Sequence, residues 1–114
     1  MTGESEFVAL TDTVLASIGA ALDAAADDSD ADLDWSQNDG ILTIDCGAGG
    51  KIIVNRHLPN RELWVAAKSG GFHFKDDAGV WRDTRSGEPL ATVLARLLKA
   101  QSGLAVALAF PGSN

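Results

Sequence analysis

Six aspartates within twelve residues are the side chains of this sequence best suited to chemistry. They are Asp23, Asp27, Asp28, Asp30, Asp32 and Asp34. Crowded carboxylates repel one another, so a hard cation that binds between them relieves the repulsion. Oxygen ligands suit magnesium, calcium, manganese or iron better than copper or zinc. The pattern predicts an open acidic ridge that binds such cations weakly. The alternative is a solvated acidic edge that only keeps the protein soluble.

The residues from Asp28 begin like an EF-hand calcium loop, but its later positions do not fit. The sixth position holds Leu33 in place of the required glycine, and the twelfth holds Asp39 in place of a glutamate. We therefore reject an EF-hand. His57 precedes a loop at Pro59. It either adds a nitrogen ligand to a metal site or is a solvated loop histidine.

Signals of ordinary enzyme chemistry are weak. No nucleophile and base stand at a recognisable spacing, so we expect no main catalytic activity. The glycine-rich stretch 47–50 opens no helix, and it lacks the context of a phosphate-binding loop. The only cysteine, Cys46, alternates with Leu42 and Ile44, which indicates a buried thiol. One cysteine also excludes a disulfide within the chain.

Charge is divided unevenly along the 114 residues, whose net charge is −7. Residues 1–50 carry 11 acidic residues and no lysine or arginine, whereas residues 51–114 carry 9 basic and 5 acidic residues. The acidic half repels nucleic acid and anionic membranes and attracts cations or basic protein surfaces. The length fits a single domain spanning 1–114. No apolar stretch approaches the roughly 20 residues that span a bilayer, and we expect a soluble cytoplasmic protein.

Hydropathy patterning predicts two helices and a sheet. Apolar residues three and four apart predict a helix over 5–25, and a second helix begins near Pro89 and stops at Gly103. Alternating patterns between turn residues predict about six antiparallel strands, over 32–37, 41–46, 51–55, 61–66, 71–75 and 80–83. The tail 104–110 is expected to pack across the second helix. The predicted fold is an α+β two-layer sandwich, with the two terminal helices on one face of the sheet and the other face open to water.

Successive side chains of a strand point to opposite faces, which also predicts the side chains that lie on the open face of the sheet. Trp64 falls there together with Asn55 and His73. An exposed tryptophan is a common anchor of protein interfaces. The alternative is a ring half-buried by a loop. Trp35 and Trp81 are predicted to be mainly structural.

Short segments spread across about residues 4–110 carry a further signal. They are 5–7, 28–30 with Asp32, 40–44, 51–56 with Pro59, 63–66, 70–74, and Trp81 followed by 85–88. In this order and spacing the set resembles the frataxin family, most closely its bacterial, CyaY-type members. No single segment is decisive, whereas the ordered set is specific.

The resemblance implies an accessory protein of iron–sulfur cluster assembly. Such a protein binds ferrous and ferric iron weakly on the acidic ridge and docks on the cysteine desulfurase and scaffold complex, as iron donor or regulator. The acidic family positions are matched by Asp23, Asp28, Asp30, Asp32 and Asp34, and the partner-contact positions by Asn55 and Trp64. Bacterial relatives often carry acids where this chain has Gly19, Ala20, Ala24 and Ala26, so fewer or weaker iron sites are expected on the helix.

Two other functions stay open. One is a ferroxidase or iron-storage protein that oligomerises with iron, in place of the monomer expected otherwise. The other is a pure docking module in which iron binding is incidental. Neither involves nucleic acid or a membrane.

Overall fold

The computed structural model describes residues 3–27 and 33–110 of the chain. The elements follow in the order α1 (Glu4–Asp27), β1 (Asp34–Asn38), β2 (Ile41–Asp45), a 3₁₀ turn η1 (Gly47–Gly49), β3 (Lys51–His57), β4 (Glu62–Ala67), β5 (Gly70–Asp77), β6 (Val80–Asp83) and α2 (Leu90–Ser102).

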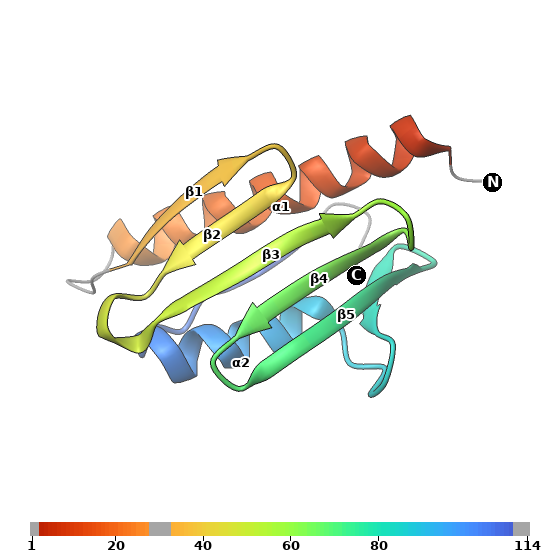
Figure 1. Cartoon of the computed structure of the whole chain (residues 1–114). Helices are drawn as coiled ribbons and strands as arrows, with labels where there is room; N and C mark the ends of the chain where they lie inside the picture. Colours follow the sequence, from red (N-terminus) through yellow and green to blue (C-terminus); the bar gives the residue numbers. More distant parts are fainter. Residues whose placement is uncertain (1–2, 28–32, 111–114) are drawn as a thin grey trace.

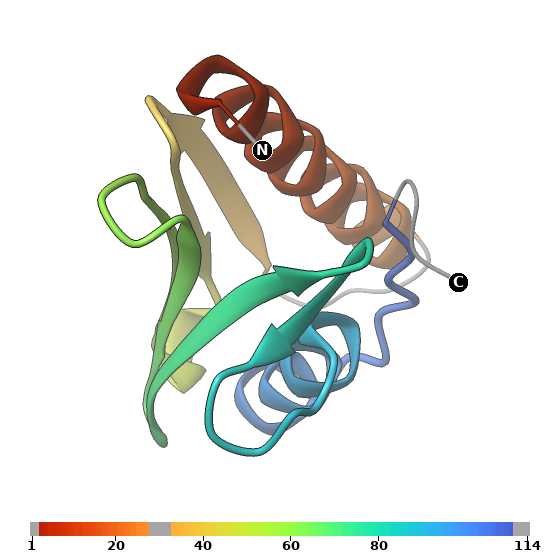
Figure 2. The same cartoon turned by 90° about the vertical axis from the view of Figure 1, so that its right-hand side faces the viewer.

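The six strands form one antiparallel sheet in which every strand pairs with its neighbour in the sequence. Both helices lie on the same face of this sheet, which is seen from its open side in Figure 1 and nearly edge-on in Figure 2. We call the covered side the inner face and the open side the outer face. The predicted two-layer α+β sandwich is therefore confirmed.

The core forms where apolar stripes of the helices meet alternate residues of the strands. Leu42, Ile44, Ile52, Val54 and Leu63 are fully buried on the inner face. On α1 the buried positions follow at helical spacing and are Phe7, Thr11, Val14, Leu15, Ile18, Gly19 and Leu22. By length and composition alone α1 could cross a membrane, but the core helix of a soluble protein passes the same test.

Three local expectations differ from the structure. Strand β3 continues to His57, which pairs with Glu62 on β4, so the prediction of a loop histidine is wrong. The second helix, expected to include Pro89 in its first turn, begins instead at Leu90, and Pro89 is its N-cap residue. The tail after α2 runs toward α1 rather than across α2 (Figure 2), and its alanines Ala105 and Ala107 line a hollow with residues of α1.

Candidate functional site

The acidic ridge lies where α1 ends and β1 begins. Asp23 and Asp27 are exposed on the last turns of α1, and Asp34 is exposed at the start of β1. The other three predicted ridge aspartates, Asp28, Asp30 and Asp32, lie outside the described residues.

Trp35 holds two of the ridge carboxylates. Its indole Nε1–H donates a hydrogen bond to Asp23 Oδ1 at 2.8 Å, and its backbone N–H donates to Asp34 Oδ1 at 2.9 Å. The ring is half-buried against the core, opposite Ile44 in the β1–β2 register. Trp35 thus has the structural role predicted for it, and it also fixes the ridge carboxylates.

A further acidic residue, Asp45, joins the ridge through the register of the sheet. It lies directly opposite Asp34 on the outer face, and both side chains are exposed. Like charges in directly opposed positions destabilise a strand pair, so a cation near this corner relieves the repulsion. Lys51 pairs with Asp45 on the far side, which offsets part of the charge. Spacing in the sequence did not indicate Asp45, whereas the hairpin turn at Asp39 and Gly40 fixes this register.

Asp12, earlier on α1 than the ridge, is held by an ion pair. The Arg56 guanidinium lies 2.7 Å from Asp12 Oδ1, and the arginine side chain is only 14% exposed. Arg56 also reaches the hydroxyl of Thr11 at 3.5 Å. The pair ties β3 to α1 and neutralises the charge of Asp12.

His57 is not brought together with the ridge aspartates. It ends β3, whereas Lys51, which begins β3, is the residue next to Asp45 and Asp34 in the register. His57 and Asp34 therefore lie toward opposite ends of the sheet, and the structure does not bring His57 together with the described ridge aspartates. Among the residues that the structure describes, no three His, Cys, Asp or Glu side chains converge as a metal cage. The described ridge offers exposed carboxylate oxygens alone, which fit a hard cation held loosely.

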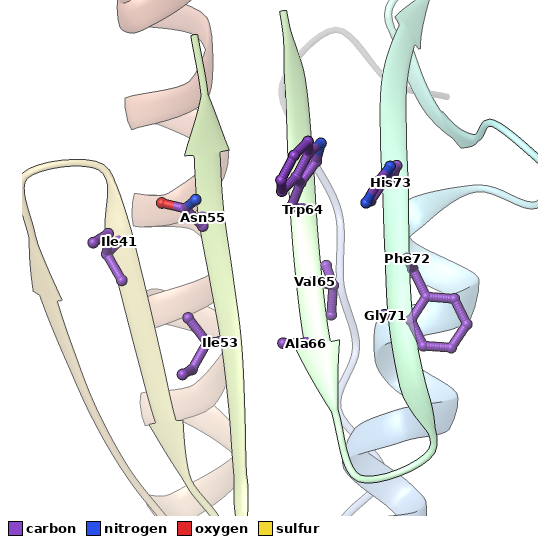
Figure 3. Close-up of a pocket in the computed structure, with 9 residues that line it drawn as sticks. All are labelled: Ile41, Ile53, Asn55, Trp64, Val65, Ala66, Gly71, Phe72 and His73. Carbon is purple, nitrogen blue, oxygen red and sulfur yellow. The ribbon is translucent and has the colours of Figure 1, made fainter. Parts of the chain in front are cut away.

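The centre of the outer face is a row of four paired residues. The register places Ile41 opposite Asn55, Asn55 opposite Trp64, and Trp64 opposite His73. The three residues predicted to contact a partner, Asn55, Trp64 and His73, therefore lie side by side on neighbouring strands (Figure 3).

Two histidines cover both faces of the Trp64 indole. The His57 ring lies 3.7 Å from it between centroids, at an angle of 9°, and the His73 ring lies 4.3 Å away at 8°. The indole Nε1–H donates to Glu62 Oε1 at 2.8 Å, and this carboxylate lies 3.9 Å from His73 Nδ1. Trp64 is half-buried by these two rings and not by a loop. The edge of the indole, rather than its two faces, is therefore what this part of the outer face presents.

A shallow apolar depression of about 370 Å³ lies beside this stack (Figure 3). Ala66 and Gly71 are paired across β4 and β5, and their small side chains leave the surface low. Ile41 and Ile53 stand beside it, 43% and 36% exposed. Exposed isoleucines at the rim of a depression are typical of a protein-binding surface. The alternation of the strands places both isoleucines on the outer face, but nothing in the sequence distinguishes them there as exposed.

Comparisons with known proteins agree with this architecture. A sequence model of the frataxin-like domain matches residues 1–104. The iron-sulfur cluster assembly protein CyaY of Ralstonia nicotianae is 47% identical over 105 residues, which cover 92% of this chain and 93% of that protein. The frataxin structure from Psychromonas ingrahamii is 31% identical, with a TM-score of 0.74, and the match covers 91% of this chain and 95% of that one. A trimeric yeast frataxin complexed with ferrous iron is 27% identical, with a TM-score of 0.59, over 75% of this chain and 81% of the yeast chain. The chain described here belongs to the frataxin family.

Proposed function

We propose that this protein is an accessory protein of iron–sulfur cluster assembly, which binds iron weakly on the acidic ridge and docks on the cysteine desulfurase and scaffold complex. The relative from Ralstonia nicotianae is named for cluster assembly, and the yeast neighbour is complexed with ferrous iron. The observation that carries the proposal is the presence of two separate surfaces, an acidic ridge and an apolar outer face. We further propose that the protein works in the cytoplasm and that it is not an enzyme in its main role.

Iron is the cargo in this proposal. The exposed carboxylates of Asp23, Asp27 and Asp34 each offer oxygen ligands, and water completes the coordination shell of the ion. An open surface fixes no coordination geometry, so binding is weak and the ion exchanges readily. Rapid exchange suits a protein that delivers or senses iron.

The two surfaces divide the docking between them. The acidic ridge steers the protein toward a basic patch on the desulfurase, because complementary charge raises the rate of encounter. The outer face supplies the apolar contact with the scaffold, around Ile53 and the Trp64 stack. Iron bound on the ridge neutralises part of its charge, and it therefore weakens the electrostatic part of the docking.

An anaerobic titration with ferrous iron, followed by two-dimensional NMR of labelled protein, tests the iron site. We expect broadening at the amides of Asp23, Asp27 and Asp34, with the β3–β5 centre unaffected. Broadening centred on His57 would move the site to the outer face, and no localised effect would leave a docking module without iron binding. Oxygen consumption that continues beyond stoichiometric binding would indicate a ferroxidase instead.

Binding to the desulfurase–scaffold complex tests the docking surface. Ile53→Asp places a charge on the outer face without touching the inner core, and we expect at least about a tenfold loss of affinity, as for a central interface residue. Thr92→Asp, on an exposed position of α2, is the matched control and leaves affinity unchanged. Equal affinities of the two variants would contradict docking through the outer face.

A further inference from the structure

The two imidazoles that cover the Trp64 indole differ in the surroundings of their nitrogen atoms. His73 is exposed, and its Nδ1 atom lies 3.9 Å from Glu62 Oε1. The Nδ1 atom of His57 is buried and has no hydrogen-bond partner among the described residues. The His73 ring can therefore take up a proton beside a carboxylate. A proton on the His57 Nδ1 atom would instead become a buried donor without an acceptor.

Glu62 is the carboxylate at the centre of this part of the outer face. It pairs with His57 on one side and with Lys75 on the other, and its Oε1 accepts the Trp64 indole N–H at 2.8 Å. Other charged groups on the surrounding elements are Asp39 in the turn before β2, Arg56 paired with Asp12 of α1, Arg61 before β4, Arg82 opposite Lys75 on β6, and Asp83 and Arg85, which line a hollow with His73. Among the described residues, no carboxylate forms a hydrogen bond with the His57 Nδ1 atom.

Protonation has a different consequence for each ring. Histidine changes its charge between about pH 5 and 8, and an imidazolium carries a proton on both nitrogens. In the closed stack, the Nδ1–H of a charged His57 would be desolvated and unpaired, and the attraction of a cation to the indole face does not offset that loss. As the pH falls, the form of a protein that can accept the proton gains population. For His57, that form is one in which the ring has left the indole and reached water.

We propose that His57 is a pH-dependent cover of the Trp64 indole: its neutral ring closes one face of the indole, and protonation releases the ring and weakens docking through the outer face. His73 stays stacked, because Glu62 lies beside its Nδ1 atom. Docking weakens because a partner that covers the apolar face must dehydrate the released imidazolium, and because the indole is then held on one side only. The docking part of the inference rests on the proposed function, whereas the release is a property of the free protein.

Two-dimensional NOE spectra of the free, full chain test the release, recorded from about pH 8 to about pH 5. We expect the NOEs between the His57 ring and the Trp64 indole to be lost by about pH 5. The NOEs between His73 and Trp64 should persist, which also shows that the sheet stays folded. The inference is overturned if the His57 NOEs persist through the titration. Loss of both sets together would overturn it as well, because the sheet itself would then be opening.

Binding to the desulfurase–scaffold complex at about pH 7.5 and about pH 5.5 tests the consequence for docking. His57→Phe keeps a flat ring that takes up no proton, and any titration of the partner affects this variant and the unaltered chain alike. On acidification, we expect the unaltered chain to lose about threefold or more in affinity beyond the loss shown by His57→Phe. His57→Gln also takes up no proton and should match His57→Phe, so it replaces that variant if the latter folds poorly. His73→Phe is the matched control, and it should keep the extra loss because His57 is still present.

The outcomes separate this inference from the proposed function. Equal losses for the unaltered chain and His57→Phe would overturn the regulation of docking by His57. If the unaltered chain binds the complex at neither pH, docking itself fails, and the docking part of this inference fails with it. The NOE spectra still decide the release of the ring in that case, because they are recorded on the free protein.

Discussion

The imidazole of His57 lies flat against the indole of Trp64, with 3.7 Å between the ring centroids and 9° between the planes. This contact comes with a cost, because the Nδ1 atom of His57 is buried and has no hydrogen-bond partner among the described residues. The stacking of the His57 ring stabilises the folded protein, whereas its buried Nδ1 atom without a partner destabilises it.

Two substitutions at His57 separate these effects. His57→Ala removes the stack and should lower the free energy of unfolding by about 0.5–1.5 kcal/mol. His57→Phe keeps a flat ring without the buried nitrogen and should raise it by roughly 1 kcal/mol. Urea unfolding measures both values. Destabilisation by His57→Phe as large as that by His57→Ala would show that the imidazole makes a specific polar contact.

The close packing of Gly19 against Trp35 predicts a coupled pair. Gly19→Ala should destabilise the protein by about 1–2 kcal/mol, because overpacking outweighs the gain in helix propensity. In a Trp35→Leu background the same change should be neutral or stabilising, since the indole is gone. A double-mutant cycle by urea unfolding should give a coupling of about 1 kcal/mol or more, whereas additive effects would show that the helix moves to make room.

The ion pair between Glu88 and Arg96 predicts a pH-dependent contribution to stability. Hydrogen bonds from the Arg96 guanidinium, at 2.9 and 3.2 Å, lower the pKa of the Glu88 carboxyl below its ordinary 4.5. A lowered carboxyl pKa stabilises the folded state above the ordinary value, and this contribution is lost as the pH falls through the folded pKa. Glu88→Gln should therefore be less stable than the unaltered chain near about pH 6, and the difference should shrink toward about pH 3.

Thermal unfolding across this pH range checks the prediction. Arg96→Gln is the matched variant and should show the same dependence, because either change removes the pair. A difference between Glu88→Gln and the unaltered chain that does not change with pH would mean that the ion pair is not its source.

Burial governs the reactivity of Cys46. Desolvation, with a smaller effect of the neighbouring Asp45 carboxylate, raises the pKa of the thiol above its ordinary 9.0. The thiolate is the reactive form, so a disulfide reagent near pH 8 should label the folded protein about a hundredfold more slowly than the urea-unfolded chain. The neutral thiol also favours folding below pH 9.0, and this contribution is lost as the pH rises above that value. Equal labelling rates would show that β2 opens readily at its end.

Sequence periodicity predicted the helices and the sheet well, because apolar and polar residues alternate along the strands and clear turn residues separate them. The same rule placed Asn55, Trp64 and His73 on the outer face. It did not predict that two imidazoles stack on Trp64, because that depends on the register of three strands and on side-chain rotamers. The nearby Pro59 predicts a loop at His57, but the pairing of His57 with Glu62 extends the strand.

The ridge was less predictable than the sheet. Composition indicated acidic residues 23–34, yet the partners of the individual carboxylates come from distant positions. Asp12 pairs with Arg56, 44 residues away in the sequence, and Asp23 accepts a hydrogen bond from Trp35, 12 residues away. Spacing within one helix carries no information on such contacts, which arise only when the helix packs on the sheet.

Each of the six strands pairs with its neighbour in the sequence, and this order affects how the protein folds while it is being synthesised on the ribosome. Each hairpin can close as soon as its second strand leaves the exit tunnel, since no pairing waits for a distant segment. The outer face is therefore complete while residues 90–102, which form α2, are still being synthesised. Until they emerge, the part of the inner face that α2 covers stays exposed to water. A chain that stalls or is truncated before Leu90 would thus have the proposed docking surface on one side and a partly uncovered apolar sheet face on the other, and such a species tends to aggregate or to bind chaperones.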